Sequence, residues 1–490
     1  MLRTVFAVAL LALAGAARAD TCDDVKARLG ASLTGVTCFH SDDLTTNNAL
    51  TTPANDSLAG VAPFAFTPIT DRGVISPTGA HPTPIARVVP GIQLDAYVAG
   101  DASHEARFLL RIPDGWNGDL VVAGASGTRS EFNGDFAWSD YVVQQGFAYA
   151  SQNKGIFNFF LAAVSVAPPA DPLACRLNPS SPVWVHFYDN DPAKPFTVWQ
   201  SAIAQAARLA REGVKGGTNH YPRHTLAVGT SNGGYQVRRA VEEAPDLFDG
   251  GIDWEGTFVD GDTFNILSDL PPAIKNYPAY VASGFDPDSA AAQAIRAAGY
   301  PPDIFDGTHS LWGNYYGQFW EVTQCQWQKR LDPTYDTYGA GTGNYDYFAR
   351  TQVSDVERNL DAFGTTGKIK VPLITLAGTM DALLPIKHHA RAYADKVAAS
   401  RKGHHHEDED DDGRAAQYRL YEVQNGNHIE SYRDTFPQLE WIQPHAQHAF
   451  DLLVDHVRHG ARLPPSQCIP RGGSISAFAR PGRCANLFEP

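Results

Sequence analysis

Short apolar runs and longer amphipathic segments alternate through much of this chain. Runs of strand length occur at residues 106–113, 119–124, 146–151, 226–228 and 247–254. Residues 197–211 instead place apolar side chains on one face at helical spacing, and 235–243 predicts a second helix. Strands that alternate with helices are typical of right-handed crossovers and of a largely parallel sheet.

Two local patterns refine this picture of the sheet. The first two strands are separated by the turn residues Asp114-Gly115-Trp116-Asn117-Gly118, which predicts a hairpin entering the sheet. A short helix is expected at 140–145. The alternation stops after 254 and resumes with a strand at 369–378, a helix near 387–398 and a final strand at 417–423.

This order predicts an α/β fold with a mostly parallel central sheet, helices on both of its faces and a large inserted cap. The core is expected at 96–254 and 368–462, the cap at 255–367, a loop-rich segment at 20–95 and a Pro- and Gly-rich tail at 463–490. Aromatic residues crowd the cap, among them Trp312, Tyr315 and Trp320. They either fill the cap's own core or line a substrate groove.

The first residues have the pattern of an export signal. Arg3 precedes an apolar run at 5–13, and Ala17-Arg18-Ala19 forms a small-residue cleavage site. The apolar run is shorter than the roughly 20 residues that cross a bilayer. We therefore expect a signal peptide at 1–19 and a secreted or periplasmic product.

Six cysteines fit an oxidising compartment. Their positions favour the local pairs Cys22–Cys38 and Cys468–Cys484, which leaves Cys175 to pair with Cys325. Six cysteines allow 15 connectivities, so this pairing is one hypothesis among many. The spacing does not resemble a zinc site, because no C-x-x-C and no matched histidine pair occur.

The formal net charge of −15 argues against nucleic acid and anionic membrane surfaces as partners. The histidines 404–406 and the acidic run 407–412 have the composition of a solvated loop, with metal binding as the alternative. We predict no cofactor and no metal. The expected partner is a substrate, and the oligomeric state stays open.

The most informative motif is Gly229-Thr230-Ser231-Asn232-Gly233, a G-x-S-x-G pentapeptide between an apolar run and a predicted helix. On a tight strand-to-helix turn the serine side chain is exposed above the sheet, and the glycines allow close backbone packing. Ser231 is therefore a candidate nucleophile. The N–H of Asn232 at the helix N-terminus is a candidate oxyanion donor.

A serine nucleophile needs a base and a carboxylate that orients the base. Asp381 follows the strand at 369–378, and His428 follows the last strand, which completes a Ser231, Asp381, His428 order. Asp253 is the second-choice acid. His388 and His389 follow Asp381 closely on the expected helix and are interpreted as surface or packing residues.

A second oxyanion donor is expected from the loop after the strand at 119–124. The backbone N–H of Ala125 or of Ser126 can fill this role. Two donors must point at one place for the oxyanion to be stabilised.

With these motifs the chain resembles the α/β-hydrolases from Phe108 to His459. The Ser231-Asn232-Gly233-Gly234 sequence, the 247–251 run and the long insertion are similar to the tannase and feruloyl esterase family and to bacterial 3-hydroxybutyrate oligomer hydrolases. Both groups are exported ester hydrolases. The tannase family usually joins cysteines beside its serine and histidine, but Thr230 and Ile429 stand there in this chain.

The resemblance and the residues together predict an exported serine ester hydrolase that acts on bulky aromatic or oligomeric, polyester-type esters. The alternatives are a secreted serine peptidase of the same fold and a non-catalytic binding protein. Asp260-Gly261-Asp262 is too short a signal to predict a calcium loop in the cap.

Overall fold

A computed structural model describes most of the chain between residues 21 and 485. The described ranges are 21–51, 83–101, 106–127, 131–132, 134–155, 159–164, 173–187, 197–335, 342–402 and 417–485. The predicted signal peptide at 1–19 and the segment containing His404–His406 with its acidic run lie outside these residues.

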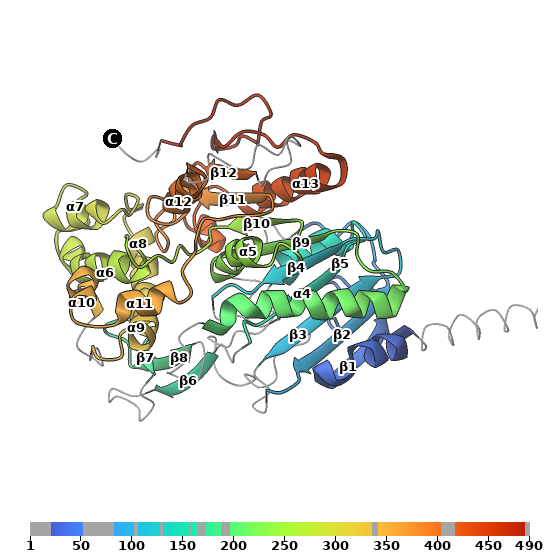
Figure 1. Ribbon diagram of the computed structural model, residues 1–490. Coiled ribbons are helices and arrows are strands. Elements are labelled where there is room, and N and C mark those ends of the chain that lie inside the picture. The colour runs from blue at the N-terminus through green and yellow to red at the C-terminus, as the bar shows by residue number, and fades with distance from the viewer. Residues whose placement is uncertain are drawn as a thin grey trace, which may run out of the picture.

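The described residues build one large sheet and one small one (Figure 1). The large sheet has ten strands in the order β1-β2-β3-β5-β4-β9-β10-β11-β12-β13. From β5 to β13 neighbouring strands are parallel, whereas β1, β2, β3 and β5 pair antiparallel. The bounds are β1 (Leu33–Ser41), β2 (Gly91–Val98), β3 (Arg107–Pro113), β4 (Leu120–Gly124), β5 (Ala148–Gln152), β9 (Thr225–Thr230), β10 (Gly250–Trp254), β11 (Leu373–Gly378), β12 (Tyr418–Val423) and β13 (Gln467–Ile469).

The mostly parallel sheet confirms the predicted fold class, but the predicted hairpin is wrong. β3 pairs with β2 and β5, and β4 lies between β5 and β9. The turn at 114–118 thus carries the chain past the position of β5 rather than back along β3. A turn motif cannot show that a strand later in the sequence, here β5, will lie between the two strands that the turn connects.

The segment expected to be loop-rich contains regular structure. Residues 21–29 are helical, η1 (Gly30–Ser32) follows, and β1 pairs with β2 at the sheet edge. Val25 and Leu29, one helical turn apart, are buried against the sheet. The expectation of irregular structure is therefore wrong at 21–41. A few apolar residues are enough to hold this segment in place, because the sheet supplies the rest of the hydrophobic core.

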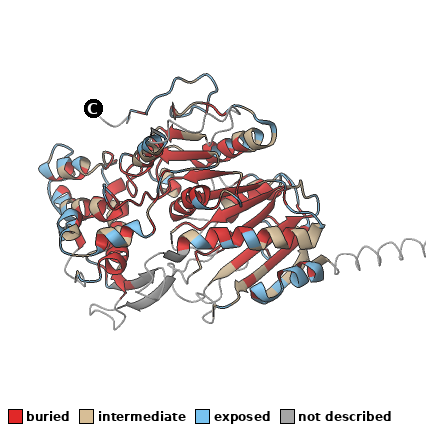
Figure 2. Cartoon of the chain, viewed as in Figure 1, coloured by how far each residue is buried: buried red, intermediate tan, exposed pale blue. Residues whose placement is uncertain are grey.

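Helices cover both faces of the large sheet (Figure 1). On one face, α4 (Thr197–Thr218), α5 (Asn232–Glu243) and α12 (Ala390–Lys402) share a hydrophobic core with the strands. On the other face, η3 (Asp135–Ser139), α3 (Asp140–Val143) and α13 (Gln443–His459) do the same. Figure 2 shows that the strands between these layers are buried. The helices predicted at 140–145, 197–211, 235–243 and 387–398 correspond to α3, α4, α5 and α12.

The insertion after β10 is helical and stands at one end of the sheet (Figure 1). Next to it, β6 (Phe159–Val164), β8 (Val183–Phe187) and β7 (Cys175–Arg176) form the small sheet. The helices of the insertion are α6 (Ile266–Ala282), α7 (Ala290–Ala297), α8 (Leu311–Gln318), α9 (Trp320–Leu331), η4 (Thr342–Asn344), α10 (Tyr347–Thr351) and α11 (Val356–Asp361).

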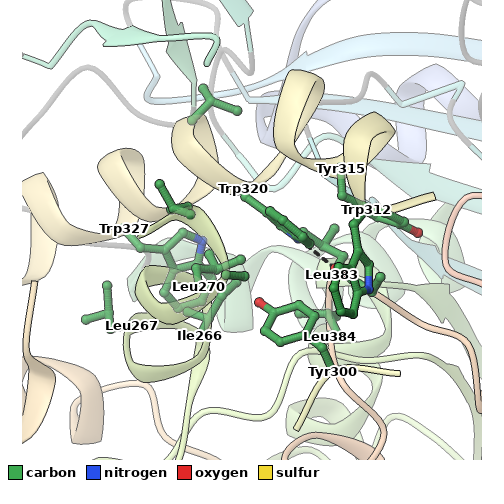
Figure 3. Packing of buried hydrophobic residues seen from close by; sticks show 14 of the residues in the cluster. Ile266, Leu267, Leu270, Tyr300, Trp312, Tyr315, Trp320, Trp327, Leu383 and Leu384 are labelled. Atoms are coloured by element: carbon green, nitrogen blue, oxygen red, sulfur yellow. Dashed lines mark hydrogen bonds between the residues drawn. The ribbon is translucent and has the colours of Figure 1, made fainter. Parts of the chain in front are cut away.

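Its aromatic side chains form the hydrophobic core of the insertion itself. Trp312, Tyr315, Trp320 and Trp327 are fully buried and belong to one hydrophobic cluster that includes residues of α6 (Figure 3). The Trp320 indole N–H donates to the carbonyl of Ala382 at 2.7 Å. These residues therefore fill the insertion and fasten it to the loop after β11.

The three disulfides have the predicted pairing: Cys22–Cys38, Cys175–Cys325 and Cys468–Cys484. Cys175–Cys325 joins β7 of the small sheet to α9 of the insertion. Among the described residues, no helix combines the length and the apolar character that a bilayer span requires.

Candidate active site

Ser231 lies in the turn between β9 and α5 and adopts a strained backbone conformation, with φ 58° and ψ −121°. Such a conformation is costly for a non-glycine residue and marks a functional turn. The flanking glycines make the turn feasible. A Cβ at Gly229 would lie 2.3 Å from the Gly233 carbonyl oxygen, and one at Gly233 would lie 2.5 Å from that of Gly124. The close packing inferred from the motif is confirmed.

Three side chains from three loops form one hydrogen-bonded row. His428 Nε2 lies 3.1 Å from Ser231 Oγ, and His428 Nδ1 lies 2.8 Å from Asp381 Oδ2. The other carboxylate oxygen of Asp381 accepts the backbone N–H groups of Leu383 at 2.8 Å and Leu384 at 2.7 Å. These bonds fix the carboxylate, which in turn can hold His428 as the tautomer with its proton on Nδ1.

A close approach of two backbones brings the Asp381 and His428 loops together. Gly378, the last residue of β11, contacts Gly426 so closely that an added Cβ would lie 2.2 Å from the Gly426 carbonyl. The N–H of Met380 donates to the Gly426 carbonyl at 2.8 Å, and that of Asn425 donates to Thr379 Oγ1 at 2.9 Å. These contacts hold the two loops side by side, and the loops thereby position Asp381 next to His428.

Glu255 is a carboxyl of this site that the sequence motifs did not reveal. Glu255, the residue after β10, has Oε2 at 3.5 Å from His428 Nδ1 and accepts the Gly378 N–H with Oε1 at 3.0 Å. Burial, reinforced by the neighbouring Asp381 charge, raises the pKa of Glu255 well above its usual value. An acidic residue directly after a predicted parallel strand is the signal that could have found it.

The loop after β4 carries the two predicted oxyanion donors, Ala125 and Ser126. The Ala125 N–H donates to the side-chain oxygen of Gln236 at 3.0 Å, which corrects its assignment as an oxyanion donor. Gln236 is held in turn by its own N–H donation to the Trp199 carbonyl at 2.7 Å. Ser126, the other predicted donor of this loop, stays a prediction, as does Asn232, the first residue of α5.

Comparison with known proteins links part of the chain to one hydrolase family. Residues 334–487, which include Asp381 and His428, match the family model for 3HB-oligomer hydrolase. D-(-)-3-hydroxybutyrate oligomer hydrolases of Burkholderia thailandensis and Burkholderia mallei are each 33% identical over 123 residues. That match spans 24% of this chain and 16% of each relative.

Solved structures extend the likeness to nearly the whole chain. An esterase from Aspergillus oryzae superposes with a TM-score of 0.53 at 13% identity and covers 90% of both chains. Feruloyl esterase B from the same organism gives 0.50 at 13% identity and 91% of both chains. The chain has the α/β-hydrolase fold. The resemblance to 3-hydroxybutyrate oligomer hydrolases is confirmed over 334–487, and the resemblance to the feruloyl esterase group is confirmed for the fold.

Within this α/β-hydrolase fold the rival residues have other partners. Asp253 accepts the Nε–H of buried Arg238 at 2.6 Å and the hydroxyl of Thr375 at 2.8 Å, so it is not the acid that faces His428. His388 and His389 lie in the turn before α12, not on the helix, and both contact Asp269 of α6. Their interpretation as packing residues agrees with this burial.

Two other sequence features lie within the described residues. Thr230 and Ile429 occupy the places where the tannase family has cysteines, so the serine and histidine loops are not tethered there by a disulfide. Asp260 forms an ion pair with Lys396 at 2.5 Å. Within the described ranges, the one group of side chains close enough to share a metal ion is Glu255, Asp381 and His428, which includes two members of the hydrogen-bonded row.

Proposed function

We propose that this protein is a serine-dependent carboxylic ester hydrolase. The observation that carries the proposal is the continuous row of Ser231 hydroxyl, His428 imidazole and Asp381 carboxylate. The strained turn of Ser231 supports it, because strain of this kind is retained where a nucleophile must be presented. The similarity to 3HB-oligomer hydrolases over 334–487 also supports it, because that stretch includes two of the three side chains.

In the proposed first step, Ser231 Oγ attacks the ester carbonyl while its proton moves to His428 Nε2. The bond from His428 Nδ1–H to Asp381 stabilises the imidazolium that forms. Negative charge develops on the former carbonyl oxygen. It is stabilised by the backbone N–H groups of Asn232 and Ser126 and by the N-terminal dipole of α5.

The proton on His428 then passes to the alcohol oxygen as the ester C–O bond breaks, which leaves an acyl group on Ser231. Water enters, gives a proton to His428 and attacks the acyl carbonyl. Collapse of the second tetrahedral intermediate releases the acid and returns the proton to Ser231. Every proton is carried by His428, so this sequence of steps uses no cofactor.

For the substrate, we propose bulky aromatic or oligomeric hydroxy-acid esters. Oligomers of 3-hydroxybutyrate are the substrates named for the Burkholderia relatives, and ferulate esters are named for one structural neighbour. The buried aromatic residues of the insertion are not part of this inference, because they pack in its core. We further propose an exported product, which the three disulfides support.

The test compares the wild-type protein with Ser231→Ala on nitrophenyl esters of graded acid size, on 3-hydroxybutyrate oligomers and on matched peptide anilides. We expect ester turnover with a stoichiometric acyl burst, fluorophosphonate labelling of Ser231, and a loss of at least about 10⁴-fold in kcat for the variant. Ser400→Ala in α12 is the matched control and keeps full activity. Turnover of anilides alone identifies a peptidase, and an unlabelled Ser231 contradicts any serine hydrolase.

A further inference from the structure

Two carboxyl groups, not one, face the Nδ1 side of the His428 imidazole. Asp381 Oδ2 lies 2.8 Å from Nδ1 and Glu255 Oε2 lies 3.5 Å from it. One nitrogen or oxygen atom of each of these three side chains lies within 4.8 Å of the chosen atoms of the other two. All three side chains are buried. The two carboxyls come from neighbouring parallel strands, since Glu255 follows β10 and Asp381 lies just beyond β11.

The two oxygens of Glu255 have different environments. Oε1 accepts the Gly378 N–H at 3.0 Å, which is a structural contact at the end of β11. Oε2 is buried and has no hydrogen bond of standard geometry among the described residues, and the Trp254 side chain is a further polar neighbour of this carboxyl. A buried polar atom without a partner is costly, so its position beside an imidazole calls for an explanation. The backbone of Glu255 is also strained, with φ 51°.

The charges around Glu255 disfavour a second carboxylate at this place. Glu255 interacts electrostatically with Asp381 and with Glu430 of the His428 loop. The hydroxyl of Tyr315, from α8, is a further neighbour of Glu255. Burial and the Asp381 charge therefore hold the pKa of Glu255 well above its usual range. A second negative charge in this buried site is disfavoured, so the protonated form of Glu255 is favoured.

We propose that Glu255 is a second positioning carboxyl of the active site, which bears a proton while Asp381 is charged and becomes the acceptor for His428 Nδ1–H when the Asp381 charge is removed. This inference rests on the proposed function, because it assigns a role within the same row. In the native protein the pair keeps a single negative charge beside the imidazole. In Asp381→Asn, Glu255 loses its proton to solvent, and its carboxylate orients His428.

The central test measures the rate of fluorophosphonate labelling of Ser231 against pH in four proteins: wild type, Glu255→Gln, Asp381→Asn and the double variant. Glu255→Gln keeps the acceptor for Gly378 and stays neutral, so we expect less than a ten-fold change at pH 7. Asp381→Asn is expected to fall about 10²-fold at pH 7 and to recover as pH rises and Glu255 ionises. The double variant is expected to fall about 10⁴-fold with no recovery, the loss typical of a triad without its acid.

A matched control separates this role from general burial of a carboxyl. Asp303 in the insertion is also buried with a raised pKa, and it accepts bonds from Ser310 and Trp312. Adding Asp303→Asn to Asp381→Asn is expected to leave the pH-dependent recovery unchanged. Equal rates for Asp381→Asn and the double variant at every pH overturn the proposal. A loss in Glu255→Gln alone as large as that in Asp381→Asn also overturns it, because Glu255 would then be charged in the native protein.

A second measurement does not depend on the double variant folding. In ¹⁵N-labelled Asp381→Asn, the Nδ1-bound proton of His428 is expected to move downfield with the same pH midpoint as the labelling rate. A resonance that does not change with pH contradicts the proposal. Neither readout needs ester turnover: a wild-type protein that is not labelled refutes the proposed function, whereas a labelled wild type without the Glu255-dependent recovery refutes only this inference.

Discussion

The Lys154 ammonium is buried beneath the loop that carries Ser126. Its Nζ donates to the carbonyl of Ser126 at 2.8 Å and to that of Ala125 at 3.4 Å, and it also bonds the Gly127 carbonyl. A buried cation needs such partners. Because C=O and N–H point in opposite directions across a trans peptide, a carbonyl of Ala125 turned toward Lys154 directs the Ser126 N–H away from it. Lys154 is therefore a positioning residue for the proposed oxyanion donor.

We predict that Lys154→Met lowers kcat for ester hydrolysis by about 10- to 100-fold and changes KM little. The loss stays below the 10²- to 10³-fold typical of a deleted oxyanion donor, because Ser126 is retained but held less firmly. Steady-state kinetics on a nitrophenyl ester measure the two constants separately. Lys396→Met, which removes a lysine paired with Asp260, is the control with unchanged kcat. A raised KM with normal kcat contradicts this role.

At the scale of elements, the active site depends on how closely the ends of β11 and β12 approach. Asp381 and His428 are 47 positions apart in sequence, and the contact between Gly378 and Gly426 sets their separation in space. The loops are then joined by the Met380 N–H to the Gly426 carbonyl. Any side chain at Gly378 must push these loops apart, because backbone atoms cannot rotate out of the way.

We predict that Gly378→Ala lowers kcat by at least about 10²-fold, because a misplacement of about 1 Å between reacting groups can cost this much. Gly317→Ala on α8 is the matched control, because a Cβ there meets nothing within 4 Å. Activity and the thermal midpoint Tm are measured together for both variants. If Gly378→Ala keeps full activity, the glycine contact does not position the triad.

At the scale of the whole molecule, buried carboxyls outside the triad tie stability to pH. Burial raises the pKa of Glu430 to about 8 and those of Glu131 and Asp140 to about 7. In the unfolded chain these groups ionise near pH 4. Unfolding at pH 5 to 8 therefore releases protons, so this contribution to stability is lost as pH rises. His389 acts oppositely, because burial lowers its pKa and the unfolded imidazole gains a proton below about pH 6.5.

We predict that the free energy of unfolding falls from pH 5 toward pH 9, because these three carboxyls release protons on unfolding in this range, whereas the His389 imidazole takes up only one. Differential scanning calorimetry between pH 5 and 9, without added thiol, gives the Tm values that check this. Glu430→Gln removes the carboxyl with the highest pKa of the three and is expected to make Tm fall less steeply with pH. A Tm that rises steadily from pH 6 to 9 shows that other groups dominate.

The sequence by itself determined the parts of this protein that depend on local pattern. Alternating strands and helices indicated the fold class, and the G-x-S-x-G turn identified Ser231 because its glycines are required by local backbone packing. The positions of Asp381 and His428 followed from the rule that parallel strands end at one edge of the sheet. The disulfide pairing was also anticipated, since two pairs are close in sequence.

Only the tertiary structure decided which of several chemically equivalent groups meet. It placed β5 between β3 and β4, engaged the Ala125 N–H with Gln236, and turned Glu255 rather than Asp253 toward His428. Each outcome depends on contacts between residues far apart in the chain. A carboxylate or an N–H has the same local signal whether it faces a catalytic imidazole or a structural partner, and packing alone selects between them.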